Sequence, residues 1–100
     1  MIETDVKIPE AFKSDLERAV KILKDGGCKE VFLFGSLAKG RSGDNSDVDL
    51  AIRGCPPERF FSLYGDLMFA LKHRVDLVDL DVSDPFTEYL SQKGGLLQLA

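Results

Sequence analysis

One stretch of this chain constrains its fold more than any other: an apolar run, a glycine–serine turn, and a second apolar run that opens with two aspartates. Residues 31–34 read Val-Phe-Leu-Phe, and a continuous apolar run of this kind is typical of a strand buried on both faces. Gly35-Ser36 ends the run. After a polar loop, Asp47-Val48-Asp49 opens a second strand, which the apolar residues 50–52 continue.

The two aspartates of the second strand point in the same direction. Because successive side chains of a strand alternate between its two faces, Asp47 and Asp49 share a face, roughly 6.6 Å apart along the backbone. Two carboxylates held side by side repel each other unless a cation lies between them. A pair of magnesium ions, about 3.5–4 Å apart, suits such a site.

A third acid is expected beside this pair. An apolar stripe at helical spacing follows Pro56-Pro57, and residues 74–80 then read as a third strand. A helix that joins two strands predicts a right-handed crossover and a parallel pair. Parallel neighbours lie about 4.8 Å apart, so Asp76 would lie beside Asp47 and Asp49, whereas Asp79 and Asp81 have the opposite parity.

The turn, the acid pair and the strand after it together resemble the nucleotidyltransferase superfamily, which includes the polymerase-beta-like enzymes. The strongest resemblance is to the minimal nucleotidyltransferases, small partners of HEPN-domain proteins in prokaryotic toxin–antitoxin pairs. The resemblance implies that Gly35 and Ser36 cradle a triphosphate and that Asp47 and Asp49 hold two magnesium ions. It also places a third carboxylate at the Val-Asp-Leu-Val position, which is Asp76.

The same resemblance implies an activity and a partner. The reaction would transfer a nucleoside monophosphate, AMP from ATP, to an acceptor hydroxyl and release pyrophosphate. A HEPN-type protein would complete the site and would itself be modified on a tyrosine, so that this chain is the antitoxin of the pair. Two other functions remain open: a non-catalytic module that neutralises its partner by contact, and a homo-oligomeric enzyme that modifies a small molecule such as an antibiotic.

The loop after Ser36 offers further phosphate contacts. Ser36 can cap a short helical turn over residues 37–39, whose N–H groups would face the anion. Lys39 and Arg41 are candidate phosphate partners, although surface charges of no special role explain them equally well. Residues 35–42 also differ from a P-loop by one residue, but Arg41 replaces the required lysine and no helix follows. A calcium-loop interpretation of residues 44–49 fails because its glycine and glutamate are absent.

One hundred residues predict a single domain, residues 1–100, with a loosely held lead-in over residues 1–8 and an apolar tail over residues 95–100. An amphipathic stripe after Pro9 predicts a first helix that ends at Gly26-Gly27. The expected fold is α/β of the α+β type, with two layers. It consists of a small mixed sheet of three or four strands with helices packed on it.

Charge and cysteine content exclude several function classes. A net charge of −4 disfavours binding to duplex nucleic acid. Cys28 and Cys55 are unclustered in the sequence and fit neither a zinc site nor a disulfide framework. With no signal peptide and no apolar run long enough for a membrane, we expect a cytoplasmic protein. His73, the only histidine, is interpreted as a surface or capping residue.

Overall fold

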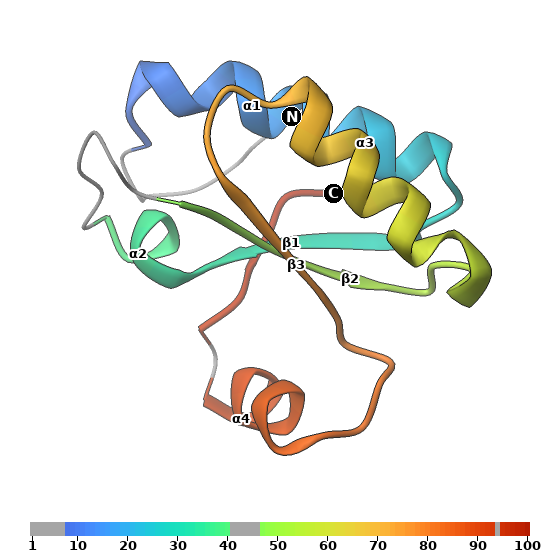
Figure 1. Cartoon of the computed structure of the whole chain (residues 1–100). Helices are drawn as coiled ribbons and strands as arrows, with labels where there is room; N and C mark the ends of the chain where they lie inside the picture. Colours follow the sequence, from blue (N-terminus) through green and yellow to red (C-terminus); the bar gives the residue numbers. More distant parts are fainter. Residues whose placement is uncertain (1–7, 41–46, 94) are drawn as a thin grey trace.

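The structure is a computed structural model, and it describes residues 8–40, 47–93 and 95–100. Helices and strands alternate along the chain in the order α1 (Glu10–Asp25), β1 (Glu30–Phe34), α2 (Gly35–Ala38), β2 (Val48–Arg53), the 3-10 turn η1 (Pro57–Arg59), α3 (Phe60–Ala70), β3 (Val75–Asp79), α4 (Pro85–Lys93) and β4 (Leu97–Gln98). The four strands form one sheet, and Figure 1 shows β1, β2 and β3 of this sheet between the helices.

The sheet is mixed, as the sequence predicts. Its strand order is β3-β2-β1-β4. Strand β1 pairs antiparallel with both β2 and β4, and β2 pairs parallel with β3. The parallel pair follows from the helical connection through α3, because parallel neighbours need a crossover that leaves and re-enters the sheet at the same ends.

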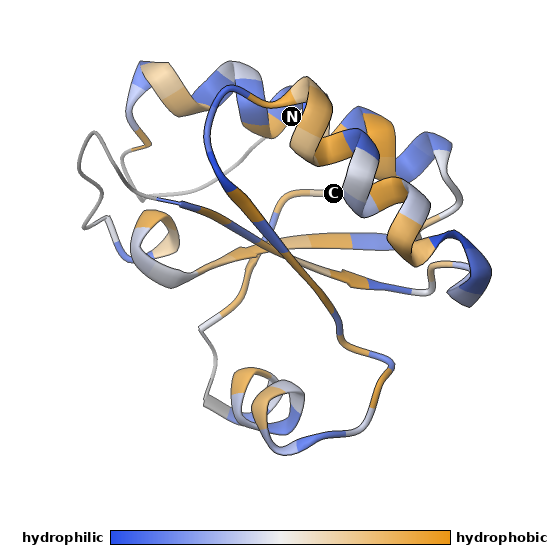
Figure 2. Cartoon of the chain, viewed as in Figure 1, coloured by the Kyte–Doolittle hydropathy of each residue, from blue (hydrophilic) through white to orange (hydrophobic). Residues whose placement is uncertain are grey.

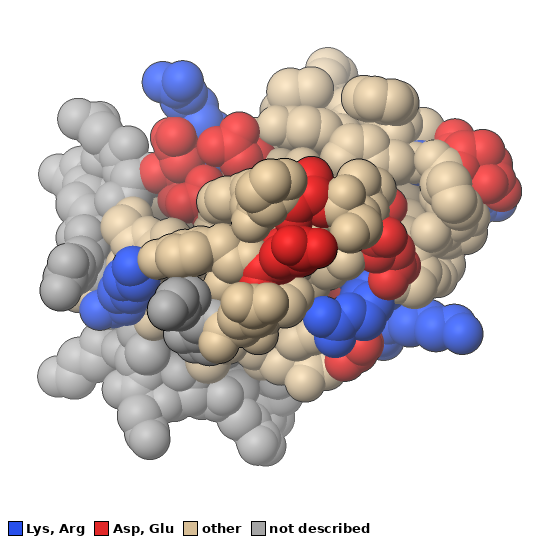
Figure 3. Space-filling model, turned by 90° about the horizontal axis from the view of Figure 1, so that it is seen from below, with Lys and Arg blue, Asp and Glu red and all other residues tan. Residues whose placement is uncertain are grey.

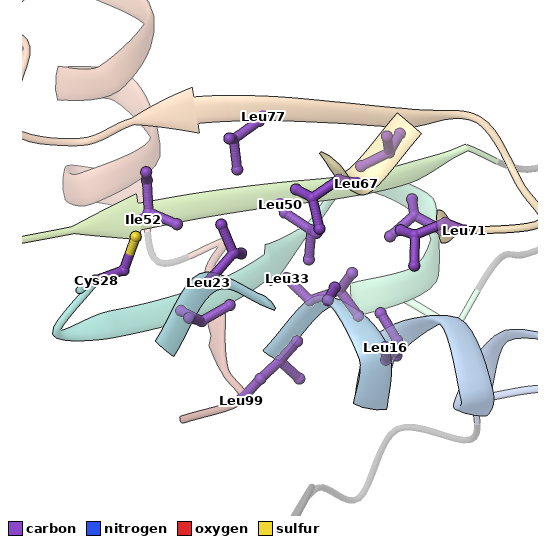
Figure 4. Close-up of a cluster of buried hydrophobic side chains, with 14 of the residues drawn as sticks. Leu16, Leu23, Cys28, Leu33, Leu50, Ile52, Leu67, Leu71, Leu77 and Leu99 are labelled. Carbon is purple, nitrogen blue, oxygen red and sulfur yellow. The ribbon is translucent and has the colours of Figure 1, made fainter. Parts of the chain in front are cut away.

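Helices α1 and α3 cover one face of the sheet (Figure 1). Apolar residues of both helices pack into the core against the strands, as expected for helices on a sheet. Helix α3 is apolar over most of its length in Figure 2, and it also exposes Phe61, Met68 and Phe69. Figure 4 shows leucines of α1, α3, the three longer strands and the C-terminal segment converging on one core. The fully buried members of this core include Leu16, Leu23, Leu33, Leu50, Ile52 and Leu67.

Helix α4 lies on the opposite face of the sheet (Figure 1). A second, smaller apolar cluster joins Leu90 of this helix to Phe32, Phe34 and Ala51 of the strands. Strand β1 is therefore buried on both faces, as its continuous apolar run predicts. The predicted α/β fold, a small mixed sheet with packed helices, is confirmed; α4 additionally covers the second face, which a two-layer description omits.

Specific contacts fix the start of α4 and the C-terminal tail. The Asp84 carboxylate accepts a hydrogen bond from the Thr87 N–H (2.9 Å), and Thr87 Oγ1 accepts one from the Asp84 N–H (3.2 Å), a reciprocal N-terminal cap of α4. The apolar tail that the sequence predicts over residues 95–100 tucks onto the domain. Its β4 residues pair with β1, and Leu99 is buried.

The two cysteines are free thiols, in line with the prediction that they form no disulfide framework. Cys28 and Cys55 are unclustered in the sequence, yet both are buried, free thiols in the same core. Burial, together with a hydrogen bond to the Cys55 thiol, raises the pKa of Cys28 to about 12. Thiols in such surroundings are unreactive. Across the described ranges, no helix is both long enough and apolar enough to cross a bilayer.

Candidate active site

The acids singled out in the sequence lie where β2 and β3 begin. Asp49 and Asp76 are register partners in the parallel β2–β3 pair, and paired residues of neighbouring strands point to the same face. Phe34, the last residue of β1, is the partner of Asp49 on its other side. Phe34 belongs to the apolar cluster under α4, so both carboxylates lie on the α4 face, where Figure 3 shows acidic side chains gathered.

Gly35 directly contacts this acidic site. Its φ of +76° lies in the left-handed region that glycine tolerates best. A Cβ at this position would also overlap Oδ2 of Asp49. Both constraints select glycine at the turn between β1 and α2, because any side chain would be strained and would displace the Asp49 carboxylate.

The carboxylates of the site interact strongly with one another. Burial, then the negative charges of Asp76 and Asp47, and then a hydrogen bond between the Asp49 and Asp76 side chains together raise the pKa of Asp49 to about 6. Neighbouring carboxylates that disfavour each other's ionisation are characteristic of sites that share a proton or a cation.

Asp47 lies just before β2, and its Oδ1 is 3.9 Å from Nε of the exposed Arg74. Within the described part of the chain, no three acidic, histidine or cysteine side chains converge closely enough to form a metal cluster. The expected convergence of Asp47, Asp49 and Asp76 is therefore incomplete, and the tight pair is Asp49–Asp76. Magnesium commonly takes only one or two carboxylates, with substrate phosphates and water supplying the other ligands. The Asp49–Asp76 pair fits that requirement.

The predicted phosphate contacts divide into three cases. Ser36 lies inside α2 rather than capping it, because the residue at the cap position is Phe34 and no side chain caps the helix. The Lys39 N–H, expected to face an anion, instead bonds to the carbonyls of Gly35 and Ser36 at 3.2 Å. The Lys39 side chain is exposed. Arg41 lies outside the described residues.

Three further residues were considered as neighbours of the site, and only Tyr64 contacts it. Asp79 and Asp81 are turned away, as their parity predicts: Asp81 Oδ2 accepts from the Gly54 N–H at 2.7 Å, at the far end of β2. Tyr64 of α3, in contrast, reaches the site. Its hydroxyl lies 3.2 Å from Asp76 Oδ1 and 3.3 Å from the Val75 carbonyl. Burial and the charge of Asp76 raise the pKa of this phenol, so it remains a hydrogen-bond donor.

A hydrogen-bonded pair between Asp15 of α1 and His73, just before β3, was missed in the sequence. Asp15 of α1 is fully buried and accepts hydrogen bonds from the backbone N–H groups of Lys72 (3.1 Å) and His73 (2.9 Å) and from His73 Nδ1 (2.8 Å). The His73 ring stacks on Phe12 with ring centres 4.0 Å apart. The interpretation of His73 as a surface or capping residue is therefore wrong.

The signal for this pair was available in the sequence. Asp15 interrupts the apolar stripe of α1, between Phe12 and Ala19, and a lone acid on an apolar helix face needs a buried partner. Burial alone would raise the pKa of Asp15, but the Lys72 N–H and the His73 ring outweigh it and hold that pKa below its usual value.

An open pocket of about 420 Å³ adjoins the acids at the start of β3. Two of the acids, Asp47 and Asp76, line this pocket. The rest of the lining comes from the end of α3, the segment after it and the start of β3: Met68, Leu71, Lys72, His73, Arg74 and Val75. The volume is within the roughly 300–1,000 Å³ range of small-ligand sites.

Comparisons with known proteins agree with this fold. A chain of a toxin–antitoxin crystal structure with AMP-PNP is 28% identical and superposes with a TM-score of 0.69, covering 85% of this chain and 72% of that one. A structure of tri-AMPylated Shewanella oneidensis HEPN toxin with MNT antitoxin gives 24% identity and a TM-score of 0.64 over 88% and 71% of the two chains. A minimal nucleotidyltransferase gives 22% and 0.66 over 97% and 99%. A search of curated proteins by sequence found no match.

A mixed sheet whose second and third strands open with facing aspartates beside a glycine turn defines a nucleotidyltransferase fold. The family described as polymerase beta, nucleotidyltransferase, matches residues 17–98. The chain belongs to this family.

Proposed function

We propose that this chain transfers a nucleoside monophosphate, AMP from ATP, to a hydroxyl group of a partner protein. The observation that carries the proposal is the contact of Gly35 with Asp49, together with the pairing of Asp49 and Asp76. A side chain at position 35 would displace the Asp49 carboxylate, so the glycine keeps that carboxylate in place beside Asp76. Family membership supports the same reaction class.

In the proposed reaction, the acceptor oxygen attacks the α-phosphorus of ATP, the bond from that phosphorus to the bridging oxygen breaks, and pyrophosphate leaves. Asp49 and Asp76 would hold divalent magnesium, with Asp47 joining them by turning from Arg74. Bound magnesium lowers the pKa of a hydroxyl and neutralises charge on the triphosphate. Asp76 would take the acceptor's proton, and the hydrogen bond from Tyr64 supports this role because it would orient the Asp76 carboxylate. Gly35 and Ser36 would border the triphosphate, with the exposed Lys39 and with Arg41 as its cationic partners.

The proposed acceptor is a tyrosine of a HEPN-type protein, and the proposed role is that of the antitoxin in a toxin–antitoxin pair. Related structures support it: one is a toxin–antitoxin with AMP-PNP, and another pairs tri-AMPylated HEPN toxin with MNT antitoxin. A protein acceptor also suits the large exposed side chains of α3, Phe61 and Phe69, which are 82% and 95% exposed. Exposed aromatic groups of this kind mark protein-interaction surfaces.

The test is incubation with ATP labelled at the α-phosphate, magnesium, and either a HEPN-domain protein or an aminoglycoside. We expect label on the protein, lost with chelator and lost in Asp49→Asn. The exposed Asp66 of α3 provides a matched control, since Asp66→Asn removes one negative charge away from the site. Label on the aminoglycoside would establish a small-molecule enzyme instead. Binding of the partner without any transfer would establish a contact-only module.

A further inference from the structure

We propose that Phe86 of α4 is the residue on which the purine base of the nucleotide stacks. The inference rests on the proposed function and adds to it the side chain that recognises the nucleoside. It also narrows the substrate class, because a purine offers a larger flat surface to an aromatic ring than a pyrimidine does.

A row of three side chains crosses the sheet at the end where the acids lie. Asp76 of β3 is the register partner of Asp49 on β2, and Asp49 is the register partner of Phe34 on β1. Register partners point to the same face of a sheet, and directly opposed antiparallel residues have Cβ atoms about 4.5–5.5 Å apart. The Phe34 side chain therefore lies next to the Asp49 carboxylate.

Phe86 continues this row from the sheet onto α4, the helix that covers the same face (Figure 1). The ring centres of Phe86 and Phe34 are 5.9 Å apart and their planes meet at 65°, an edge-to-face contact. Phe34 is buried, whereas Phe86 is 49% exposed. The Phe86 ring is thus anchored on a neighbour of the acids and still offers about half of its surface to a ligand.

The geometry of the transfer directs the nucleoside toward this ring. In an in-line displacement the attacking and leaving oxygens lie on opposite sides of the α-phosphorus, so the ribose projects to the side of that axis. The α-phosphate would be held at Asp49 and Asp76, which point to the α4 face. The nucleoside would then lie along α4, and Phe86 is the aromatic residue of this helix that packs on Phe34.

The charges of α4 suit a neutral base better than a phosphate group. Asp84 and Glu88 flank Phe86 in the sequence, and their negative charges repel phosphates but not a base. Stacking on an aromatic ring needs no charged partner. The hydrogen bond from the Thr87 N–H to the Asp84 carboxylate, 2.9 Å long, closes the first turn of the helix around Phe86 and so fixes the backbone that carries the ring.

Three substitutions separate stacking from structure. Phe86→Leu keeps an apolar side chain against Phe34 but removes the aromatic face, whereas Phe86→Tyr keeps that face. Tyr89→Leu is the matched control, because it removes a ring of the same helix that is 58% exposed. Thermal unfolding would verify that all three variants fold.

The binding experiment titrates each protein, with magnesium and without an acceptor, with ATP, CTP and inorganic tripolyphosphate in a calorimeter. We expect wild type to bind ATP several-fold more tightly than CTP. Phe86→Leu should bind ATP about tenfold more weakly and tripolyphosphate unchanged, while Phe86→Tyr and Tyr89→Leu should match wild type. The adenine H2 and H8 resonances should move upfield on binding, through the ring current of residue 86, except in Phe86→Leu.

Three results would overturn the proposal. The first is equal affinity of wild type for ATP and CTP. The second is undiminished ATP affinity in Phe86→Leu. The third is an equal loss of affinity for ATP and tripolyphosphate in that variant, since this would mean that the ring only supports the shape of the site.

The transfer experiment uses the same variants with labelled ATP and the HEPN-domain protein. We expect Phe86→Leu to raise the KM for ATP about tenfold and to leave the KM for the acceptor unchanged. A fall in kcat with an unchanged KM for ATP would mean a structural role and would overturn the proposal. Absence of transfer by wild type itself would refute the proposed function, whereas the binding preference for a purine would still stand or fall on its own.

Discussion

At the scale of single residues, the site joins like charges that the fold alone would avoid. Burial and the charges of two neighbouring carboxylates raise the pKa of Asp49 to about 6. The metal-free folded state therefore holds a proton that the unfolded chain releases at lower pH. The raised pKa makes ionised Asp49 a destabilising group. This unfavourable charge interaction is confined to the site, as is common where a protein binds cations.

Asp49→Asn should therefore stabilise the metal-free protein while abolishing transfer. A folded pKa above the unfolded value of 3.8 lowers stability as pH rises through the interval from 3.8 to about 6. The penalty is complete above that interval, on the order of 1–2 kcal/mol once solvent screening is included, and vanishes below it. Urea unfolding at pH 7.5 and pH 4 measures the gain. Magnesium should stabilise wild type but not the variant, and a variant less stable at pH 7.5 would contradict the assignment.

Tyr64 provides a second residue-scale prediction. Loss of its hydrogen bond to Asp76 in Tyr64→Phe should raise the magnesium concentration for half-maximal transfer about 10–100-fold, because groups that orient a metal ligand tune its affinity. Excess magnesium should restore much of the rate. Tyr89→Phe on α4, where the phenol is 58% exposed, is the matched control. An unchanged magnesium requirement in Tyr64→Phe would show that Asp76 does not need this bond.

At the scale of elements, the Asp15–His73 contact fastens α1 to the segment that enters β3. Four hydrogen bonds end on one fully buried carboxylate, so the position of the pocket wall depends on the first helix of the chain. Local pattern could predict each element, because amphipathic stripes, glycine stops and the Asp84 cap are local signals. It could not predict this contact, whose partners are 58 residues apart.

Asp15→Asn should destabilise the fold by about 2–4 kcal/mol, because the amide NH₂ faces N–H groups and would remain buried without an acceptor. Asp25→Asn, at the exposed end of the same helix and 3.5 Å from Lys21, should change stability by less than about 0.5 kcal/mol. Chemical denaturation compares the two. Because the Asp15 pKa is lowered in the folded state, the contribution of the pair is present above the unfolded pKa and disappears as pH falls through the folded pKa, so the variants should converge in strong acid. If Asp15→Asn and Asp25→Asn were equally stable at pH 7, the Asp15–His73 pair would have no structural role.

At the scale of the whole molecule, the chain is a sheet covered on two faces, with the Asp49–Asp76 pair at one end of its strands and exposed aromatic groups on α3. The parallel β2–β3 pair and the position of Asp76 beside Asp49 follow from residue parity and one crossover, so sequence sufficed for them. The strand order, with β1 between β2 and β4, was not predicted. Three contacts depend on side-chain packing between distant segments, which no local pattern encodes. These are the contact of Asp47 with Arg74, that of Tyr64 with Asp76, and that of Cys28 with Cys55.

The aromatic surface of α3 gives a prediction at this scale. Phe69 is 95% exposed and follows Met68, which lines the pocket. Phe69→Ser should raise the KM for a protein acceptor about tenfold or more and leave the KM for ATP unchanged, since only the protein acceptor would contact this helix surface. Tyr89→Ser, on the opposite layer, should alter neither value. An unchanged KM for the protein acceptor in Phe69→Ser would place the interface elsewhere.

The two buried thiols have a practical consequence. An alkylating reagent reacts with thiolates, so Cys28, with a pKa of about 12 and no access to solvent, should be inert in the native protein. Modification by iodoacetamide, followed by mass spectrometry, should then proceed only when the interior transiently opens. The labelling half-time therefore measures how often the interior opens, and it should lengthen when ATP and magnesium are added.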